Sequence, residues 1–177
     1  MSRRVMKLLA DTRGAAVVEL ALVVPVLLTT MVGVIDMSNA FSRKLALEQG
    51  AQRAIEKILQ TTDDTTVEAT LSNEVICQVN GTTTGGACKT TPIAASNVVV
   101  TYRLECKNGA GAIASQTSTV STAFDAFVCA SGTVSAARYI SVAVTDKYTP
   151  MFPIHFGSFN TSDGTYHLSA TAGMRMQ

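Results

Sequence analysis

The sequence has few charged residues. Lys, Arg, Asp and Glu make up 15% of its 177 residues, whereas about a quarter is usual in a soluble domain. The formal net charge is only +1, which argues against a nucleic-acid-binding surface because such a surface needs clustered basic residues. A chain of this length fits one domain with an additional segment.

The residue combinations that enzymes and metal sites require are also scarce. The two histidines, His155 and His167, have no metal-ligating partner at a suitable spacing. The stretch GTTTGG at 81–86 lacks the GKS or GKT ending of a phosphate-binding loop. The sequence therefore predicts no catalytic residue, no metal and no cofactor, and we expect a protein that is not an enzyme.

Cysteine does not occur before residue 77. The four cysteines are Cys77, Cys88, Cys106 and Cys129. Zinc sites need closely spaced pairs, whereas the gaps here are 10, 17 and 22 residues. An even number favours two disulfides formed in an oxidising compartment. Of the three possible pairings we favour Cys77 with Cys88 and Cys106 with Cys129. This pairing closes the loops 78–87 and 107–128, the two least regular segments of the chain.

Apolar residues, in contrast, are concentrated near the N-terminus. Residues 15–35 form a run of 21 residues with a single charge. As a helix this run would be roughly 31 Å long, about the thickness of the hydrocarbon core of a membrane. Residues 1–14 carry a net charge of +3 and residues 15–177 a net charge of −2. The basic N-terminus is therefore expected in the cytoplasm and the rest of the chain across the membrane.

The single charge of the apolar run is Glu19. An acidic side chain inside a membrane helix costs on the order of 2–3 kcal/mol on insertion scales, so it needs a partner charge unless it reaches the headgroups. Glu19 is the fifth residue after Gly14. Cleavage after Gly14 would create an α-amino group at Ala15. That cation could pair with Glu19 of a neighbouring subunit and fix the axial register of two helices.

The stretch RGAAVVELALVVPVLL, residues 13–28, resembles the TadE-like family of minor pilins and pseudopilins of tight-adherence (Tad, type IVb) pili. The chain departs from related sequences in having Leu20 after the glutamate, where Tyr is frequent, and Ala15 at the start of the mature form. VAVTDKYTPMFP and LSATAGMRMQ near the C-terminus are also similar to the family's closing pattern, whereas residues 60–135 are not covered. The first stretch carries the resemblance through Arg13, Gly14, Val18, Glu19, Ala21, Leu22, Pro25 and Leu27.

The resemblance implies a structural protein of pilus assembly that acts in priming, at the tip or in adhesion. It implies a single-pass protein of the bacterial inner membrane, with a periplasmic head, that is cut by the prepilin peptidase between Gly14 and Ala15 and then reaches the pilus or the cell surface. The implied partners are that peptidase, other Tad pilins and pseudopilins, the inner-membrane assembly platform and the lipid bilayer, with no nucleic acid. Two alternatives are an uncleaved, signal-anchored periplasmic binding protein and a secreted enzyme behind a signal peptide.

The expected fold is α+β and pilin-like, with a long N-terminal membrane-spanning helix and a small disulfide-bonded antiparallel sheet. We expect a basic leader at 1–14, a transmembrane or filament-core helix at 15–36, an amphipathic extension at 37–60 and a head at 61–177. Pro25 should kink or soften the helix, and Gly50 could bend it. The extension should pack on the head, with a filament contact of the same stripe as the alternative, through Phe41, Leu45, Ala51, Ile55, Ile58 and Leu59.

The head should contain one helix and three strands. Asp63 or Asp64 could cap the helix, and residues 80–92 read as a loop. Alternation of apolar and polar residues predicts strands at 97–106, 137–148 and 165–176. The apolar faces of these strands should form one core with the helices.

Overall fold

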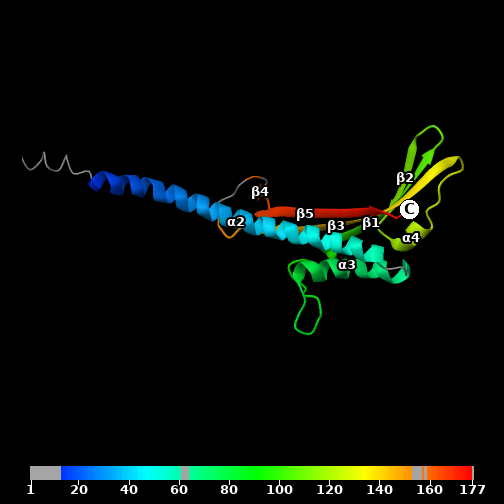
Figure 1. The fold of residues 1–177 in the computed structure, drawn as a ribbon, viewed down its shortest axis with the longest axis horizontal. Helices are drawn as coiled ribbons and strands as arrows, with labels where there is room; N and C mark the ends of the chain where they lie inside the picture. Colours follow the sequence, from blue (N-terminus) through cyan, green and yellow to red (C-terminus); the bar gives the residue numbers. More distant parts are fainter. Residues whose placement is uncertain (1–12, 61–63, 153–156, 158, 177) are drawn as a thin grey trace, which may run out of the picture.

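A computed structural model describes residues 13–60, 64–152, 157 and 159–176. The start of the leader, Asp63 and His155 lie outside this described part. The helices are α2 (Arg13–Gln60), α3 (Asp64–Asn80), the 3-10 helix η1 (Ala95–Asn97) and α4 (Ser121–Asp125). The strands are β1 (Val98–Asn108), β2 (Ile113–Ser118), β3 (Thr133–Tyr148), β4 (Phe159–Asn160) and β5 (Thr165–Arg175). The molecule is elongated because the first half of α2 projects beyond the other elements (Figure 1).

The predicted α+β class is confirmed: one long apolar helix is followed by a small antiparallel sheet with disulfides. The sheet has five strands in the order β2-β1-β3-β5-β4, and neighbouring strands are antiparallel throughout. The three predicted strands correspond to β1, β3 and β5, although β3 begins four residues earlier than expected, at Thr133. The structure adds β2 and the two-residue strand β4.

One face of the sheet carries the core. Apolar side chains alternate along β1 and β3, and Tyr102, Leu104, Ile140, Val142 and Val144 are all buried. Helices α2 and α3 cover this face (Figure 1), with buried side chains such as Leu47, Ala51, Leu71 and Val75. The opposite face of the sheet has no helix over it in the described part of the chain, and it carries polar side chains that include Thr101, Arg103 and Ser141.

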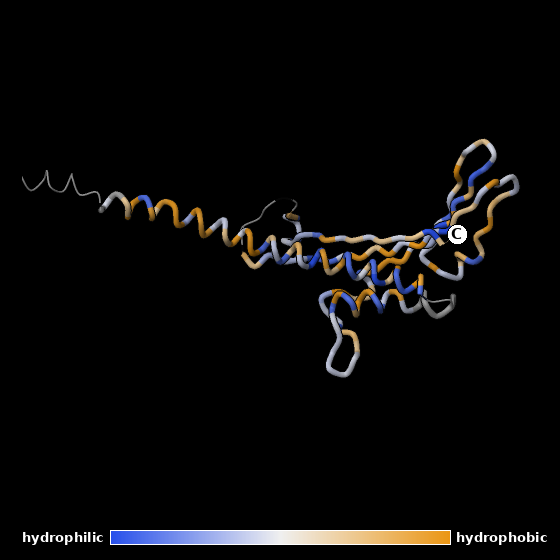
Figure 2. The backbone as a smooth tube through the Cα atoms, in the orientation of Figure 1, coloured by the Kyte–Doolittle hydropathy of each residue, from blue (hydrophilic) through white to orange (hydrophobic). Residues whose placement is uncertain are grey.

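The two halves of α2 differ in burial. Every large apolar side chain from Val17 to Met31 is exposed, and Figure 2 shows this projecting half as mostly hydrophobic. In the second half a stripe of one face is buried, and it includes Ala40, Leu47, Ala51 and Ala54. Phe41, Leu45 and Leu59 contribute little to packing on the head, since these side chains are 58%, 54% and 68% exposed. Phe41 only lines a hollow together with Tyr166 and Leu168 of β5. Alanines instead face the sheet and α3 because their small side chains let the helix approach closely.

Gly50 does not interrupt α2, which continues to Gln60. A Cβ atom at Gly50 would lie 2.7 Å from Cγ2 of Val79 on α3, much closer than non-bonded carbon atoms approach. The glycine therefore permits the close crossing of α2 and α3. This is a packing role, where the sequence had suggested a bend.

The two disulfides have the sequential pairing. Cys77 at the end of α3 is joined to Cys88, with Cα atoms 4.7 Å apart. Cys106 on β1 is joined to Cys129 after α4, with Cα atoms 5.7 Å apart. The first disulfide closes the loop after α3, and the second joins β1 to the chain between β2 and β3.

Candidate functional site

The projecting half of α2 holds the residues that the sequence singled out. Gly14 lies in the first turn of the helix, and a Cβ atom there would meet no atom within 4 Å. Glu19 is exposed, and no ion pair joins it to any other described side chain. Among the described residues Gly14 and Glu19 are thus exposed on α2, and the roles of these residues stay predictions.

This half of α2 is long and apolar enough to cross a membrane, and α2 is the one helix with this property among the described residues. A continuous apolar surface of this size is not left in water by soluble proteins. Such a surface marks a site of contact with a membrane or with another protein.

Pro25 lies inside α2, which continues on both sides of it. Proline has no N–H group, so the carbonyl of Ala21 lacks its usual partner in the helix. One turn later, the hydroxyls of Thr29 and Thr30 donate to the carbonyls of Val26 and Leu27, each at 2.9 Å. These local bonds satisfy the two hydroxyls within the helix, as an apolar environment requires. A kink at Pro25 stays a prediction.

A cluster that the sequence analysis did not predict joins α2 to the turn after β3. The carboxylate of Asp36 accepts hydrogen bonds from the backbone amides of Met151 and Phe152, at 2.9 and 3.1 Å. It also accepts one from the Tyr148 hydroxyl at 3.1 Å. We call these four residues the Asp36 clasp. Asp36 itself is buried, one turn after Gly33, which is also buried.

A second buried carboxylate lies two turns further along. Asp146 continues the buried face of β3 after Val144. Its Oδ2 atom is 3.3 Å from Nη2 of Arg43 on α2, and its Oδ1 atom accepts from the backbone N–H of Lys147 at 2.8 Å. The Arg43 contact is a charge contact without hydrogen-bond alignment, since Oδ2 receives no aligned donor from the described residues. Two carboxylates thus hold one face of α2 to β3 and the turn after it.

Sequence reasoning placed Asp36 at the outer interface of the membrane, but it predicted neither the contacts of Asp36 with the head nor the burial of Asp146, although each residue had a signal. Asp36 is the first charged residue after the apolar run, and Asp146 occupies an inward position in the alternation of β3. Burial of a carboxylate requires compensating donors. The donors to Asp36 lie 112 to 116 positions away in the sequence, and the charge partner of Asp146 lies 103 positions away, which no local pattern reveals.

An exposed cluster surrounds Asp163 in the turn before β5. The Asp163 carboxylate contacts Nζ of Lys147 at 2.8 Å and Nε2 of His167 at 2.6 Å. The hydrogen bonds from Lys147 and then His167 hold the pKa of the Asp163 carboxyl well below its usual range. Asp163 also accepts from the Thr165 hydroxyl at 2.9 Å, so the cluster closes a turn.

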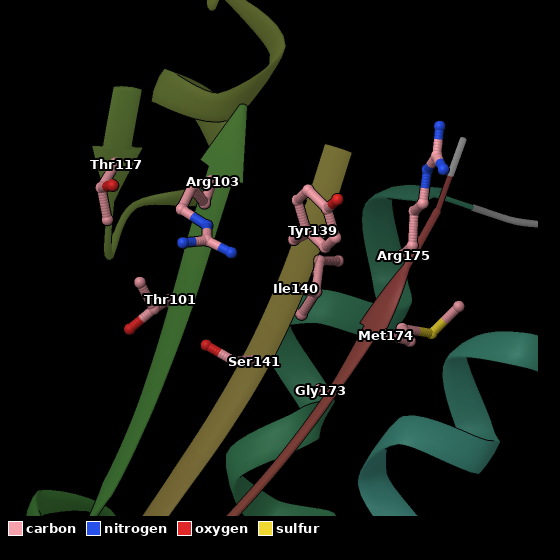
Figure 3. A pocket seen from close by; sticks show the side chains of 9 residues that line it. All are labelled: Thr101, Arg103, Thr117, Tyr139, Ile140, Ser141, Gly173, Met174 and Arg175. Carbon is pink, nitrogen blue, oxygen red and sulfur yellow. The ribbon is translucent and has the colours of Figure 1, made fainter. Parts of the chain in front are cut away.

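The uncovered face of the sheet has a shallow hollow, shown in Figure 3. Arg103 extends over the Tyr139 ring, with its guanidinium carbon 5.0 Å from the ring centre, and pairs with Glu105 at 3.1 Å. The floor is formed partly by Gly173, which has no side chain to fill the space. Neither this hollow nor any other place in the described residues gathers three metal-ligating side chains.

Comparison with known families agrees with the resemblance seen in the sequence. A family model described as TadE-like protein matches residues 14–55. This range covers the projecting half of α2, the Asp36 position and most of the stripe that packs on the head. Comparison with curated proteins and with solved structures finds no significant match. The resemblance is therefore confirmed for α2, and the sheet of the head has no matched relative.

Proposed function

We propose that this chain is a minor pilin or pseudopilin of a Tad-type pilus. The observation that carries the proposal is the TadE-like match over residues 14–55, on a helix whose apolar half projects uncovered from a disulfide-bonded head. The chain works mechanically in pilus assembly, in priming, at the tip or in adhesion, and it is not an enzyme.

The proposed precursor spans the bacterial inner membrane once, through residues 15–36, with its N-terminus in the cytoplasm and its head in the periplasm. The prepilin peptidase cuts it between Gly14 and Ala15. The assembly platform of the inner membrane then moves it into contact with other Tad pilins and pseudopilins, and toward the pilus or cell surface. The exposure of Gly14 supports access by a peptidase.

Glu19 is the proposed register residue. Its carboxylate is available on the exposed surface of α2, and the new α-amino group of Ala15 in a neighbouring subunit is the cation that would pair with it. A buried pair of opposite charges sets register more effectively than it adds net stability. This role separates the proposal from the alternative of an uncleaved, anchored binding protein, in which Glu19 would only reach the headgroups.

The test is the mass of the N-terminal peptide in the membrane fraction and in material sheared from the cell surface. We expect a chain that begins at Ala15 in both fractions. A Gly14→Val variant should retain residues 1–14 and stay in the membrane. A wild-type chain that still carries Arg13 and Gly14 in every fraction would overturn the proposal and favour the anchored alternative.

The role of Glu19 is tested separately. Glu19→Ala should still be inserted and processed but should be lost from the sheared fraction. Glu56→Ala is a matched control because Glu56 is also an exposed glutamate of α2. Equal amounts of the wild type and the Glu19→Ala variant in the sheared fraction would remove the register role.

A further inference from the structure

The turn that follows β3 presents two apolar side chains to its surroundings. Met151 is 71% exposed and Phe152 is 37% exposed. Both are fixed in position, because their backbone amides donate to Asp36 in the Asp36 clasp. A further contact joins Met151 Sδ to Nδ2 of Asn39 on α2, at 3.9 Å.

We propose that this turn, residues 149–152, docks on the outer interface of the membrane beside α2. The inference rests on the proposed membrane-spanning role of α2, and it adds a second lipid contact made by the head. It would hold the head in one orientation relative to the bilayer.

The height of the turn follows from its bond to Asp36. Residues 15–35 span roughly 31 Å as a helix, and a hydrocarbon core is about 30 Å thick. Asp36 therefore lies where the core ends. The headgroup layer on each side is only about 5–8 Å thick, and the amides of Met151 and Phe152 lie within hydrogen-bond distance of the Asp36 carboxylate. The turn must then lie in that layer.

The side chains around the turn become more polar along α2 in the direction away from the apolar span, as expected at a membrane interface. The backbone amides of Met151 and Phe152 are at the level of Asp36, and the Met151 side chain lines one edge of a hollow whose other members include Asn39, Ser42 and Arg43. These residues lie one to two turns above Asp36 on α2. The exposed apolar surface of the turn would contact the boundary between headgroups and acyl chains, and the polar side chains of the hollow would face the headgroups.

The charges near the turn are balanced within the protein. Arg43 pairs with Asp146, and Lys147 pairs with Asp163. Attraction of anionic lipids needs cations that are not already neutralised. The contact should therefore form on a bilayer of phosphatidylcholine alone, and its strength should come from the apolar side chains.

The chain contains no tryptophan, so one introduced tryptophan reports on one position. The full chain would be inserted into phosphatidylcholine vesicles that carry a quencher either on the headgroup or deep on the acyl chains. Met151→Trp is the test variant, and Phe152→Trp serves if the first does not fold. Leu28→Trp reports on the span, and Val134→Trp reports on an exposed position at the other end of β3.

We expect the headgroup quencher to remove most of the Met151→Trp emission and to leave Val134→Trp unchanged, while the deep quencher acts on Leu28→Trp. Asp36→Asn in the Met151→Trp background should weaken this quenching. Quenching of Leu28→Trp alone would overturn the docking and leave the span intact. A shielded but unquenched Met151→Trp would mean that protein covers the turn and would also overturn it. Loss of quenching at both positions would overturn the span and the docking together.

Discussion

The hydroxyl of Tyr148 donates to the carboxylate of Asp36 at 3.1 Å and so joins residues that are 112 positions apart. We expect Asp36→Asn to weaken the connection between α2 and the turn after β3, because an amide offers fewer acceptor sites than a carboxylate. Hydrogen exchange of the Met151 and Phe152 amides should become faster, since both amides donate to Asp36. Mass spectrometry of the full chain in detergent would measure this exchange.

Tyr148→Phe is the matched control for that experiment. It removes one hydrogen bond, worth on the order of 1 kcal/mol, and keeps both amide donors bonded to Asp36. Exchange of the two amides should therefore change little. Unchanged exchange in Asp36→Asn, or equal increases in the two variants, would contradict the role assigned to the carboxylate.

Titration of Tyr148 gives an independent reading of the same contact. Burial raises the pKa of the Tyr148 hydroxyl, and the hydrogen bond to Asp36 raises it further. The neutral hydroxyl therefore contributes stability at neutral pH, and this contribution is lost as the pH rises above about 10. In Asp36→Asn the pKa of Tyr148 should fall, which an ultraviolet titration of the tyrosines would detect. The absence of a shift would contradict the observed hydrogen bond.

Gly50 and Val79 provide a prediction about packing. Gly50→Ala adds helix propensity worth about 1 kcal/mol, but the new Cβ atom would clash with Val79, and overpacking costs about 1–3 kcal/mol. The variant should therefore lower the free energy of unfolding. In a Val79→Ala background the clash is removed, so the same substitution should be stabilising. Thermal unfolding would be measured for the wild type, Gly50→Ala, Val79→Ala and the double variant. We expect Gly50→Ala to lower the Tm in the first background and to raise it in the second. If the sign of the change is the same in both, α3 shifts freely to make room for the new Cβ atom.

The cluster around Asp163 predicts a pH dependence. Lys147 and His167 lower the pKa of the Asp163 carboxyl in the folded chain, whereas its unfolded value is about 3.9. A lowered pKa gives stability that is present above the unfolded value and is lost as the pH falls below about 4. Asp163→Asn should lower the Tm modestly at pH 7, and its difference from the wild type should shrink as the pH falls below about 4. Asp125→Asn, at an exposed aspartate of α4, is the control, and a difference that does not vary with pH would contradict the assignment.

The strands that the sequence predicted well are those in which apolar and polar residues alternate regularly. Alternation along 98–106 and 137–148 defined β1 and β3, because one face of each strand is buried. Strand β2 has almost no buried side chain, so the alternation that marks a half-buried strand is missing there. Phe41 and Leu45 were misplaced because a helical pattern shows which residues share a face and does not show which face meets the head.

The residues of the candidate site were harder to predict from the sequence than the fold. Gly14 and Glu19 could be proposed because their meaning is local, a spacing of five along one helix. Asp36 and Asp146 depend on donors from remote parts of the chain, and Gly50 depends on a neighbouring helix. Two of these residues are buried charges and the third is a glycine inside a helix, all of which local sequence preferences disfavour. Their presence is explained only by the tertiary contacts that they make.

Pro25 gives the last prediction, which depends on the proposed role in a pilus. A proline inside a helix costs about 3 kcal/mol relative to alanine in water, and it leaves a softer segment in the middle of the projecting half of α2. Such a segment would help the helix to leave the bilayer and to fit among other helices. Pro25→Ala should therefore leave membrane insertion intact, as measured by alkaline extraction, and should change the amount of the protein in sheared surface material. Val24→Ala is the adjacent control. If Pro25→Ala assembles like the wild type, the proline has no role in assembly and is simply tolerated by the membrane helix.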